Sequence, residues 1–218
     1  MIVCGVDEAG RGSVVGDLCI GCFVVDDTTE YDAKDSKKVS AKKRASYYAH
    51  ILETGLEVSV LRISSQELNE MHENGMSLND MEVWGFTKIL NELDIRPDRI
   101  VLDACDTNQE RFGLKVCNGL NYDPQVISCH RADSIYKETA AASIVAKYHR
   151  ELSMDSMKQI YGQDIGSGYP SDTKTIHWLT QYYQTNQSFP SNTRLFWSTI
   201  DRVKQRAQRA TLQETTEP

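Results

Sequence analysis

A pair of adjacent carboxylates near the N-terminus is the part of the sequence best suited to chemistry. Asp7 and Glu8 follow a β-branched run at residues 2–6 and precede Ala9-Gly10-Arg11-Gly12. The run predicts a short buried strand, and strand ends in α/β sheets are where ligand sites collect. Successive strand side chains point to opposite faces, so both acids can reach one small site only if the chain bends there.

The Gly-Arg-Gly turn supplies that bend and groups that suit a phosphate. Gly10 and Gly12 allow positive φ and leave the backbone open to a ligand. Arg11 offers a fork of donors that fits phosphate oxygens. The alternative is a surface turn with solvated charges, which is the better interpretation of an isolated Asp-Glu pair, so the rest of the chain must decide.

Two further acids follow predicted strands. Asp103 ends the apolar run that starts at residue 99, and Asp133 follows a strand pattern at residues 125–129. Neighbouring strands lie roughly 5 Å apart, so acids at their ends can converge. Such a cluster repels itself without cations, and Mg²⁺ or Mn²⁺ would bind carboxylate oxygens while leaving positions for water and substrate phosphate. Two ions roughly 4 Å apart would activate a water and stabilise the leaving oxygen of a phosphodiester.

Each of these two acids also has a structural interpretation. Asp103 could be a turn residue at the strand end, although Asp106 beside Thr107 and Asn108 suits that role better. Asp133 could be the N-cap of the helix that follows. If each acid is judged singly, the structural interpretation is favoured for both.

Strands and helices alternate in the elements that must position these acids. Strands are predicted at residues 2–6, 18–25, 56–63, 99–103 and 125–129, and helices at 40–52, 65–70, 79–93, 134–157, 172–185 and 192–209. The first two strands are close enough to form a hairpin. The small residues Ala140, Ala141, Ala142 and Ser143 would let their helix pack closely on the sheet.

Composition limits the class of protein. The chain of 218 residues carries a formal net charge of −7, which argues against a wholly basic surface but not against a local basic groove. Basic residues dominate residues 191–210, where a duplex could be bound or a helix face merely solvated; they are Arg194, Arg202, Lys204, Arg206 and Arg209, beside the single acid Asp201.

Location and redox state also follow from composition. No segment is long and apolar enough to span a bilayer, and the chain enters a strand without a basic leader, so a cytoplasmic protein is expected. Among the six cysteines only Cys19 and Cys22 have metal-like spacing, and they lie in an apolar strand pattern. Reduced thiols are therefore expected rather than a zinc site.

The motifs together resemble those of type 2 ribonuclease H, the ribonuclease HII family. In order they are Asp7-Glu8-Ala9-Gly10-Arg11-Gly12, Asp35-Ser36-Lys37-Lys38, Asp103, Ala132-Asp133 with Ala141-Ala142-Ser143-Ile144-Val145-Ala146-Lys147, and Gly166-Ser167-Gly168-Tyr169-Pro170-Ser171-Asp172. The resemblance extends from Val3 to about Trp197, and several ordered motifs are far more specific than any one of them. The segment from Arg194 to Thr199 is similar to archaeal members.

The resemblance implies a ribonuclease H-like α/β fold, a mixed central sheet flanked by helices with a helical C-terminal part. It implies a single catalytic domain over residues 1–210, after which the polar residues 211–218 are predicted to form a disordered tail. The implied activity is metal-dependent endonucleolytic hydrolysis of the RNA strand of RNA/DNA hybrids. The enzyme would also cut on the 5′ side of a ribonucleotide embedded in duplex DNA, leaving 3′-OH and 5′-phosphate ends, with Mg²⁺ or Mn²⁺, two ions in catalysis.

The resemblance also assigns roles to residues. The catalytic and metal-binding acids would be Asp7, Glu8, Asp103 and Asp133. Gly10, Arg11 and Gly12 would contact the ribonucleotide's 2′-hydroxyl and adjacent phosphate, and Tyr169 would pack on the sugar at the RNA–DNA junction. Ser36 and Lys37 could hold backbone phosphates or lie in a solvated loop.

Two further residues are judged from their positions alone. Lys147 lies fourteen positions after Asp133, too far along a helix for an expected catalytic role, so duplex contact or solubility is expected of it. His130 lies near Asp133 in sequence, which places it at the edge of the site without a catalytic role.

One residue departs from the family's motifs, and the function has two alternatives. Family members usually carry proline where Ser13 stands. The sister ribonuclease HIII has a different glycine turn and an additional N-terminal domain, and because this sequence starts directly at the predicted catalytic strand, ribonuclease HII is the expected family. The alternatives are another two-metal nuclease of the same fold and a non-catalytic nucleic-acid binding module.

The residues 212–218 lack the aromatic pair of a sliding-clamp peptide, so no clamp contact is predicted, and a monomer is expected.

Overall fold

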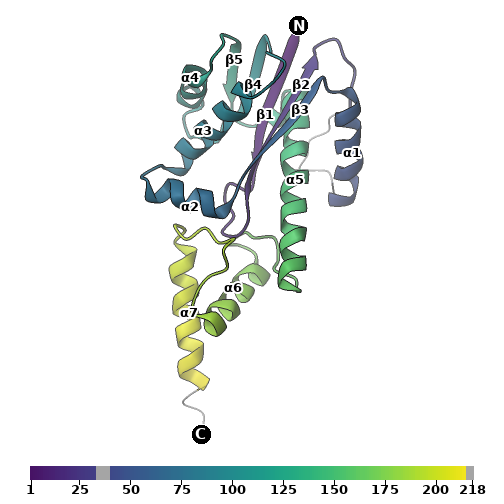
Figure 1. Cartoon of the computed structure of the whole chain (residues 1–218). Coiled ribbons are helices and arrows are strands. Elements are labelled where there is room, and N and C mark those ends of the chain that lie inside the picture. The colour runs from purple at the N-terminus through teal and green to yellow at the C-terminus, as the bar shows by residue number, and fades with distance from the viewer. Residues whose placement is uncertain (33–39, 215–218) are drawn as a thin grey trace. The chain divides into compact units, whose positions relative to one another are not determined.

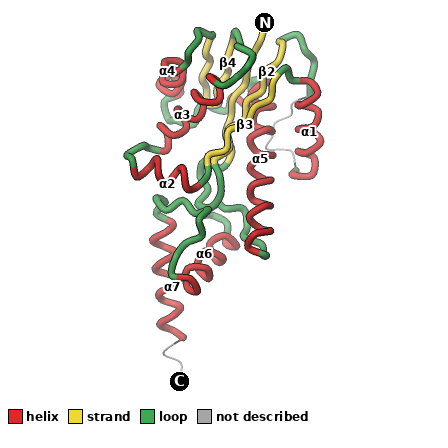
Figure 2. The backbone as a smooth tube through the Cα atoms, viewed as in Figure 1, coloured by secondary structure: helices red, strands yellow, loops and turns green. Residues whose placement is uncertain are grey.

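A mixed five-stranded sheet forms the centre of the first part of the chain (Figure 2). The computed structural model describes residues 1–32 and 40–214. The strands are β1 Ile2–Ala9, β2 Leu18–Asp26, β3 Glu57–Ile63, β4 Arg99–Asp103 and β5 Gln125–Cys129, in the order β3-β2-β1-β4-β5. β1 pairs antiparallel with β2 and parallel with β4, and β5 continues the parallel half. The predicted hairpin and mixed sheet are confirmed.

β1 is longer than predicted. It continues through Asp7 and Glu8 to Ala9, with Asp7 opposite Gly21 and Glu8 opposite Ile20 on β2. The chain turns only at Gly10, whose φ is 88°. Because both acids lie within regular strand, their side chains point to opposite faces of the sheet. The prediction that the strand ends before the acids is therefore wrong.

One face of the sheet is covered by α1 (Ala41–Thr54) and the first part of α5 (Lys137–Tyr161) (Figure 1). The α5 backbone lies close to β1 and β2, as the run of small residues predicted. A Cβ added at Gly5 would lie 2.2 Å from the carbonyl carbon of Glu138, and one at Gly21 would lie 2.4 Å from the carbonyl oxygen of Ala142. Only glycine on the strands permits this approach.

The other face is covered by α3 (Leu78–Asn91) and α4 (Gln109–Gly119) (Figure 1). Gly85 of α3 lies against Ile20 of β2, and the Phe86 and Phe112 rings meet edge to face at 5.2 Å. The helix α4 was not predicted. Its apolar face consists of little more than Phe112 and Val116, which is too short a periodic pattern to separate from a loop.

A second compact unit contains residues 10–17, 64–75 and the chain from residue 152 onward. It includes α2 (Ser65–Glu73), the end of α5, α6 (Thr173–Asn186) and α7 (Thr199–Glu214). Its core gathers apolar side chains of α5, α6 and α7, among them Met157, Leu179 and Val203. The single domain over residues 1–210 remains a prediction.

The C-terminal helix differs from its predicted bounds. It begins at Thr199 rather than at residue 192, and residues 192–198 form a loop. It continues to Glu214, past residue 211 where the tail was predicted to begin, while residues 215–218 lie outside the described residues. No helix in the described ranges is long and apolar enough to cross a bilayer. All six cysteines are free.

Candidate active site

Three of the four predicted acids meet at one end of the sheet. Carboxylate oxygens of Asp7, Asp103 and Asp133 all lie within 4.8 Å of one another. β1 and β4 run parallel with Val6 opposite Leu102, so the acids that follow these residues emerge at the same edge. The convergence predicted from strand ends is confirmed for these three.

Asp133 reaches the cluster through a tight turn after β5. Arg131 adopts a left-handed conformation, with φ of 58°, and is followed by the 3₁₀ turn Ala132–Ser134. The backbone N–H of Ala132 donates to Asp103 Oδ1 at 3.0 Å. Asp103 therefore fixes the turn that carries Asp133, and Asp133 is a buried member of the cluster rather than the N-cap of α5.

The electrostatics of the cluster call for a cation. Burial raises the pKa of Asp7 to about 7, and repulsion by Asp103 adds to the shift. A hydrogen bond from Ser143 and the positive charge of Lys147 oppose it. Buried carboxylates that repel one another in this way are a suitable donor set for a hard divalent ion.

Lys147 and Ser143 are functional candidates that sequence reasoning missed. Lys147 Nζ donates to Ser143 Oγ at 2.9 Å, and both act on the pKa of Asp7. Counting residues from Asp133 made Lys147 too remote, but Asp7 of β1 is the acid that it approaches. The sequence feature that could have identified them is their spacing of four, which puts both residues on the helix face that packs on the sheet.

The shifted pKa of Asp7 predicts how metal-free stability depends on pH. Between the unfolded value of 3.8 and the folded value of about 7, the folded state holds a proton that the unfolded state has released. The free energy of unfolding should therefore fall as pH rises through this window, by at most about 1.4 kcal/mol per pH unit. Urea denaturation in a chelator measures the slope, and Asp7→Asn should remove this component. An identical slope in both proteins would contradict the assignment.

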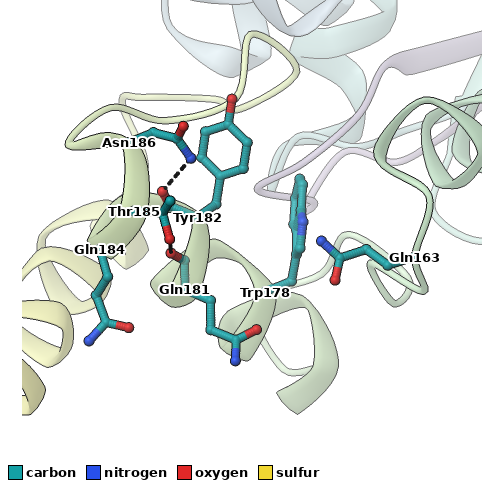
Figure 3. A pocket seen from close by; sticks show the side chains of 7 residues that line it. All are labelled: Gln163, Trp178, Gln181, Tyr182, Gln184, Thr185 and Asn186. Carbon is teal, nitrogen blue, oxygen red and sulfur yellow. Dashed lines mark hydrogen bonds between the residues drawn. The ribbon is translucent and has the colours of Figure 1, made fainter.

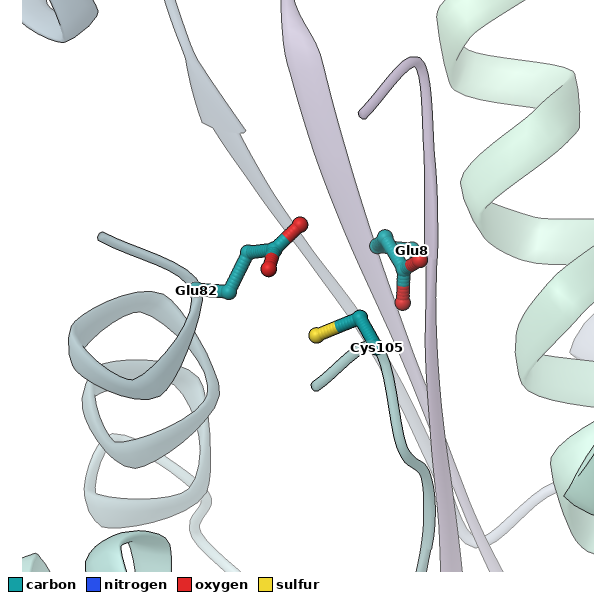
Figure 4. A group of neighbouring side chains, drawn as sticks. All are labelled: Glu8, Glu82 and Cys105. Atoms are coloured by element: carbon teal, nitrogen blue, oxygen red, sulfur yellow. The ribbon is translucent and has the colours of Figure 1, made fainter. Parts of the chain in front are cut away.

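Glu8 lies on the opposite face of β1 from these acids. Its carboxylate belongs to a second group with Glu82 of α3 and Cys105, whose ligand atoms lie within 4.8 Å of one another (Figure 4). Glu82 is fully buried, although sequence reasoning passed over it. It could have been identified from the sequence, because this charged residue lies one helical turn before Phe86, on the helix face that the 3.6-residue period predicts to be buried.

The Gly-Arg-Gly turn and Tyr169 lie together in the second unit. A Cβ added at Gly12 would stand 3.9 Å from Tyr169 Cε1. The backbone N–H groups of Val14 and Val15 donate to the carbonyl of Gly168 at 2.8 and 3.1 Å. Ser13, where proline is usual in the family, donates from its hydroxyl to the Gly10 carbonyl at 2.8 Å and closes the turn by a hydrogen bond instead.

The remaining predicted site residues lie outside the acid cluster or outside the described residues. Ser36 and Lys37 lie outside the described residues. The His130 ring is hydrogen-bonded through Nε2 to the Asp106 carbonyl oxygen at 2.8 Å. Asp106 forms the predicted turn, accepting from the N–H of Asn108 at 3.1 Å.

The basic C-terminal segment divides into exposed and buried residues. Arg202, Arg206 and Arg209 are exposed on α7, as a duplex-binding wall requires, whereas Arg194 is fully buried and cannot belong to it. Arg206 lines a hollow of about 420 Å³ at the start of α6 with polar neighbours that include Ser171 and His177. The hollow offers donors for a phosphate.

Another hollow, of about 490 Å³, has a different character. Seven residues line it, namely Gln163, Trp178, Gln181, Tyr182, Gln184, Thr185 and Asn186 (Figure 3). None of them is charged at neutral pH, and two of the polar side chains are bonded to the α6 backbone. Without a charged side chain it is a weaker candidate for a phosphate backbone than the hollow beside Arg206.

Comparison with known proteins decides the family. The family model described as Ribonuclease HII matches residues 4–200. The chain belongs to the ribonuclease HII family. Ribonuclease HII of Thermococcus sibiricus is 42% identical over 210 residues, which cover 94% of this chain and 92% of that protein.

Solved structures agree with the family and show the fold. The crystal structure of ribonuclease H2 from Pyrococcus horikoshii OT3 matches with a TM-score of 0.89 and 37% identity, over 96% of this chain and 100% of that one. The PCNA:RNase HII complex from Archaeoglobus fulgidus matches with a TM-score of 0.80 and 29% identity, over 91% and 96% of the two chains. The predicted ribonuclease H-like fold is confirmed. As a ribonuclease HII the chain is an RNA/DNA-hybrid endonuclease, and neither alternative function is favoured.

Proposed function

We propose that this ribonuclease HII cuts on the 5′ side of a ribonucleotide embedded in duplex DNA, with Asp7, Asp103 and Asp133 as the acids that hold its metal. The convergence of these three side chains is the observation that carries the proposal. Glu8 is the proposed fourth acid. It would act from the side of the sheet where Glu82 lies, and Glu8→Gln tests whether that position is needed.

Mg²⁺ or Mn²⁺, two ions during catalysis, is the proposed cofactor. The fit rests on the donor set, because three close carboxylates with a raised Asp7 pKa gain from a hard cation. Bound divalent ions supply activation of the attacking water and charge neutralisation at the leaving oxygen. The chain's own groups hold Asp7 in place for that role: Ser143 by a hydrogen bond, and Lys147 by its charge.

Recognition of the ribonucleotide is proposed for the Gly10-Arg11-Gly12 turn. A 2′-hydroxyl both donates and accepts, so open backbone groups can test for it, and the Arg11 guanidinium suits the adjacent phosphate. The Tyr169 ring, which lies near Gly12, would pack on the neighbouring sugar, where a second hydroxyl would not fit. Ser36 and Lys37 are proposed phosphate contacts, and Arg202 and Arg206 a proposed wall for the duplex.

A cleavage assay on matched duplexes tests the proposal. One labelled DNA duplex carries a single ribonucleotide, and its control is the same duplex without it. With Mg²⁺ or Mn²⁺ the first should be cut on the 5′ side of the ribonucleotide, and the control should stay intact. Cleavage of both duplexes, or of the first in a chelator, would overturn it.

The cytoplasm is the proposed location. All six cysteines are free, including Cys4 and Cys22, whose sulfur atoms lie 3.1 Å apart. Such buried thiols are compatible with a reducing compartment, which the low number of metal-like cysteine spacings in the sequence had also suggested.

A further inference from the structure

Arg194 is the largest fully buried side chain of the described residues, and its position has no part in a surface for nucleic acid. It lies in the loop before α7, and its guanidinium donates to backbone carbonyls. Nη1 donates to the Arg11 carbonyl at 2.9 Å, and Nε and Nη2 donate to the Gly16 carbonyl at 3.1 and 2.9 Å. One side chain thus joins two carbonyls five residues apart.

These bonds close the loop that follows β1. The Arg194 N–H also donates to the Val14 carbonyl at 2.8 Å, and the Gly16 N–H donates to the Asn192 carbonyl at 2.9 Å. The segment around Arg11 has no sheet ladder to satisfy its carbonyl, so a side-chain donor takes that role. The loop conformation therefore depends on a guanidinium reaching both of its ends.

Burying a guanidinium is unfavourable, and an apolar side chain of similar size would fill the space without that penalty. An apolar residue could not, however, fix the orientation of the two carbonyl groups. A planar fork with several donors fixes the orientation of both carbonyls, and hence of the peptide planes beside them. The peptide between Arg11 and Gly12 is one of these planes.

We propose that Arg194 is a positioning residue for ribonucleotide recognition. By holding the Arg11 carbonyl it sets the direction of the Gly12 N–H and of the Arg11 side chain, the groups assigned to the 2′-hydroxyl and its phosphate. The same loop also fixes the distance between the Gly-Arg-Gly turn and Tyr169, because the N–H groups of Val14 and Val15 donate hydrogen bonds to the Gly168 carbonyl. This inference rests on the proposed function of the turn.

Arg194→Lys is the informative variant, because it keeps the charge but replaces the three guanidinium nitrogens that bond the two carbonyls with a single nitrogen of no fixed plane. Binding is measured in full-length protein that also carries Asp7→Asn, so that neither duplex is cut. The readout is the ratio of Kd for the all-DNA duplex to Kd for the single-ribonucleotide duplex, with Mg²⁺ present. Leu179→Ala is the matched control, because it removes packing from the apolar core of the same unit, to which Val14 and Val15 also belong, but none of the hydrogen bonds of Arg194.

The ratio should fall roughly tenfold in the lysine variant, the factor that one ordinary hydrogen bond supplies. Affinity for the all-DNA duplex should change less than about twofold, and Leu179→Ala should keep the ratio while lowering the Tm. A retained ratio in Arg194→Lys, or an equal loss in Leu179→Ala, overturns the inference.

If Arg194→Lys does not fold, Ser65→Ala takes its place. Ser65 Oγ donates to the same Gly16 carbonyl at 3.0 Å, so its loss loosens the loop in the same direction. The ratio should then fall by about twofold, and an unchanged ratio overturns the inference. Failure of the proposed function is distinguishable, because it would show in the parent protein as an absent preference for the ribonucleotide.

Discussion

Asp7→Asn and Asp103→Asn should each lower the rate of cleavage by at least roughly a thousandfold. Each removes a charge from the three acids proposed to hold the metal, and bound metal contributes several kcal/mol of transition-state stabilisation. Asn keeps the shape of the side chain. At position 103 it also keeps an oxygen to accept from the Ala132 N–H, so the turn that carries Asp133 should persist. The loss is therefore expected in catalysis and not in folding.

Stability in a chelator separates the two effects. Neutralising one acid relieves repulsion and the burial of charge, so the metal-free Tm at about pH 8 should hold or rise. Asp123→Asn, at an exposed position away from the cluster, is the control and should retain full activity. Turnover within tenfold of the parent in the variants at Asp7 or Asp103, under saturating metal, would show that the three acids are not the metal site.

Gly5→Ala should have the largest effect on folding. The added methyl would lie 2.2 Å from the carbonyl carbon and oxygen of Glu138 and 2.4 Å from the N–H nitrogen of Thr139. These are backbone atoms of α5 and cannot move aside as a flexible side chain would. The helix must withdraw from the sheet, at a cost of about 3 kcal/mol or more, which is a large part of the stability of an ordinary domain.

Chemical denaturation with and without the substitution measures this cost, and Gly12→Ala is the matched control. A methyl at Gly12 would stand 3.9 Å from the Tyr169 ring, an ordinary contact, so the free energy of unfolding should change little. Cleavage should nevertheless fall, because that methyl occupies space proposed for the ribose. A Gly5→Ala protein as stable as its parent would contradict the close packing of α5 on β1.

Much of the site could be predicted from the sequence because its signals are local. An apolar run followed by an acid marks a strand with a carboxylate near its end, and three such runs pointed to Asp7, Asp103 and Asp133. The small residues of α5 predicted its close approach to the sheet. Local patterns failed where an element had few apolar residues, as with α4, and where a loop preceded a helix, as at residues 192–198.

Sequence alone determined which residue types stand at the strand ends, the order of the motifs and, through them, the family. Only the tertiary structure decided which of these side chains share a site, because that depends on where each strand stops and which face it presents. β1 continues three residues farther than the apolar run at residues 2–6, so Glu8 faces Glu82 and not Asp7. Lys147 and Arg194 reach their partners through space, across separations of more than a hundred residues that no periodic pattern records.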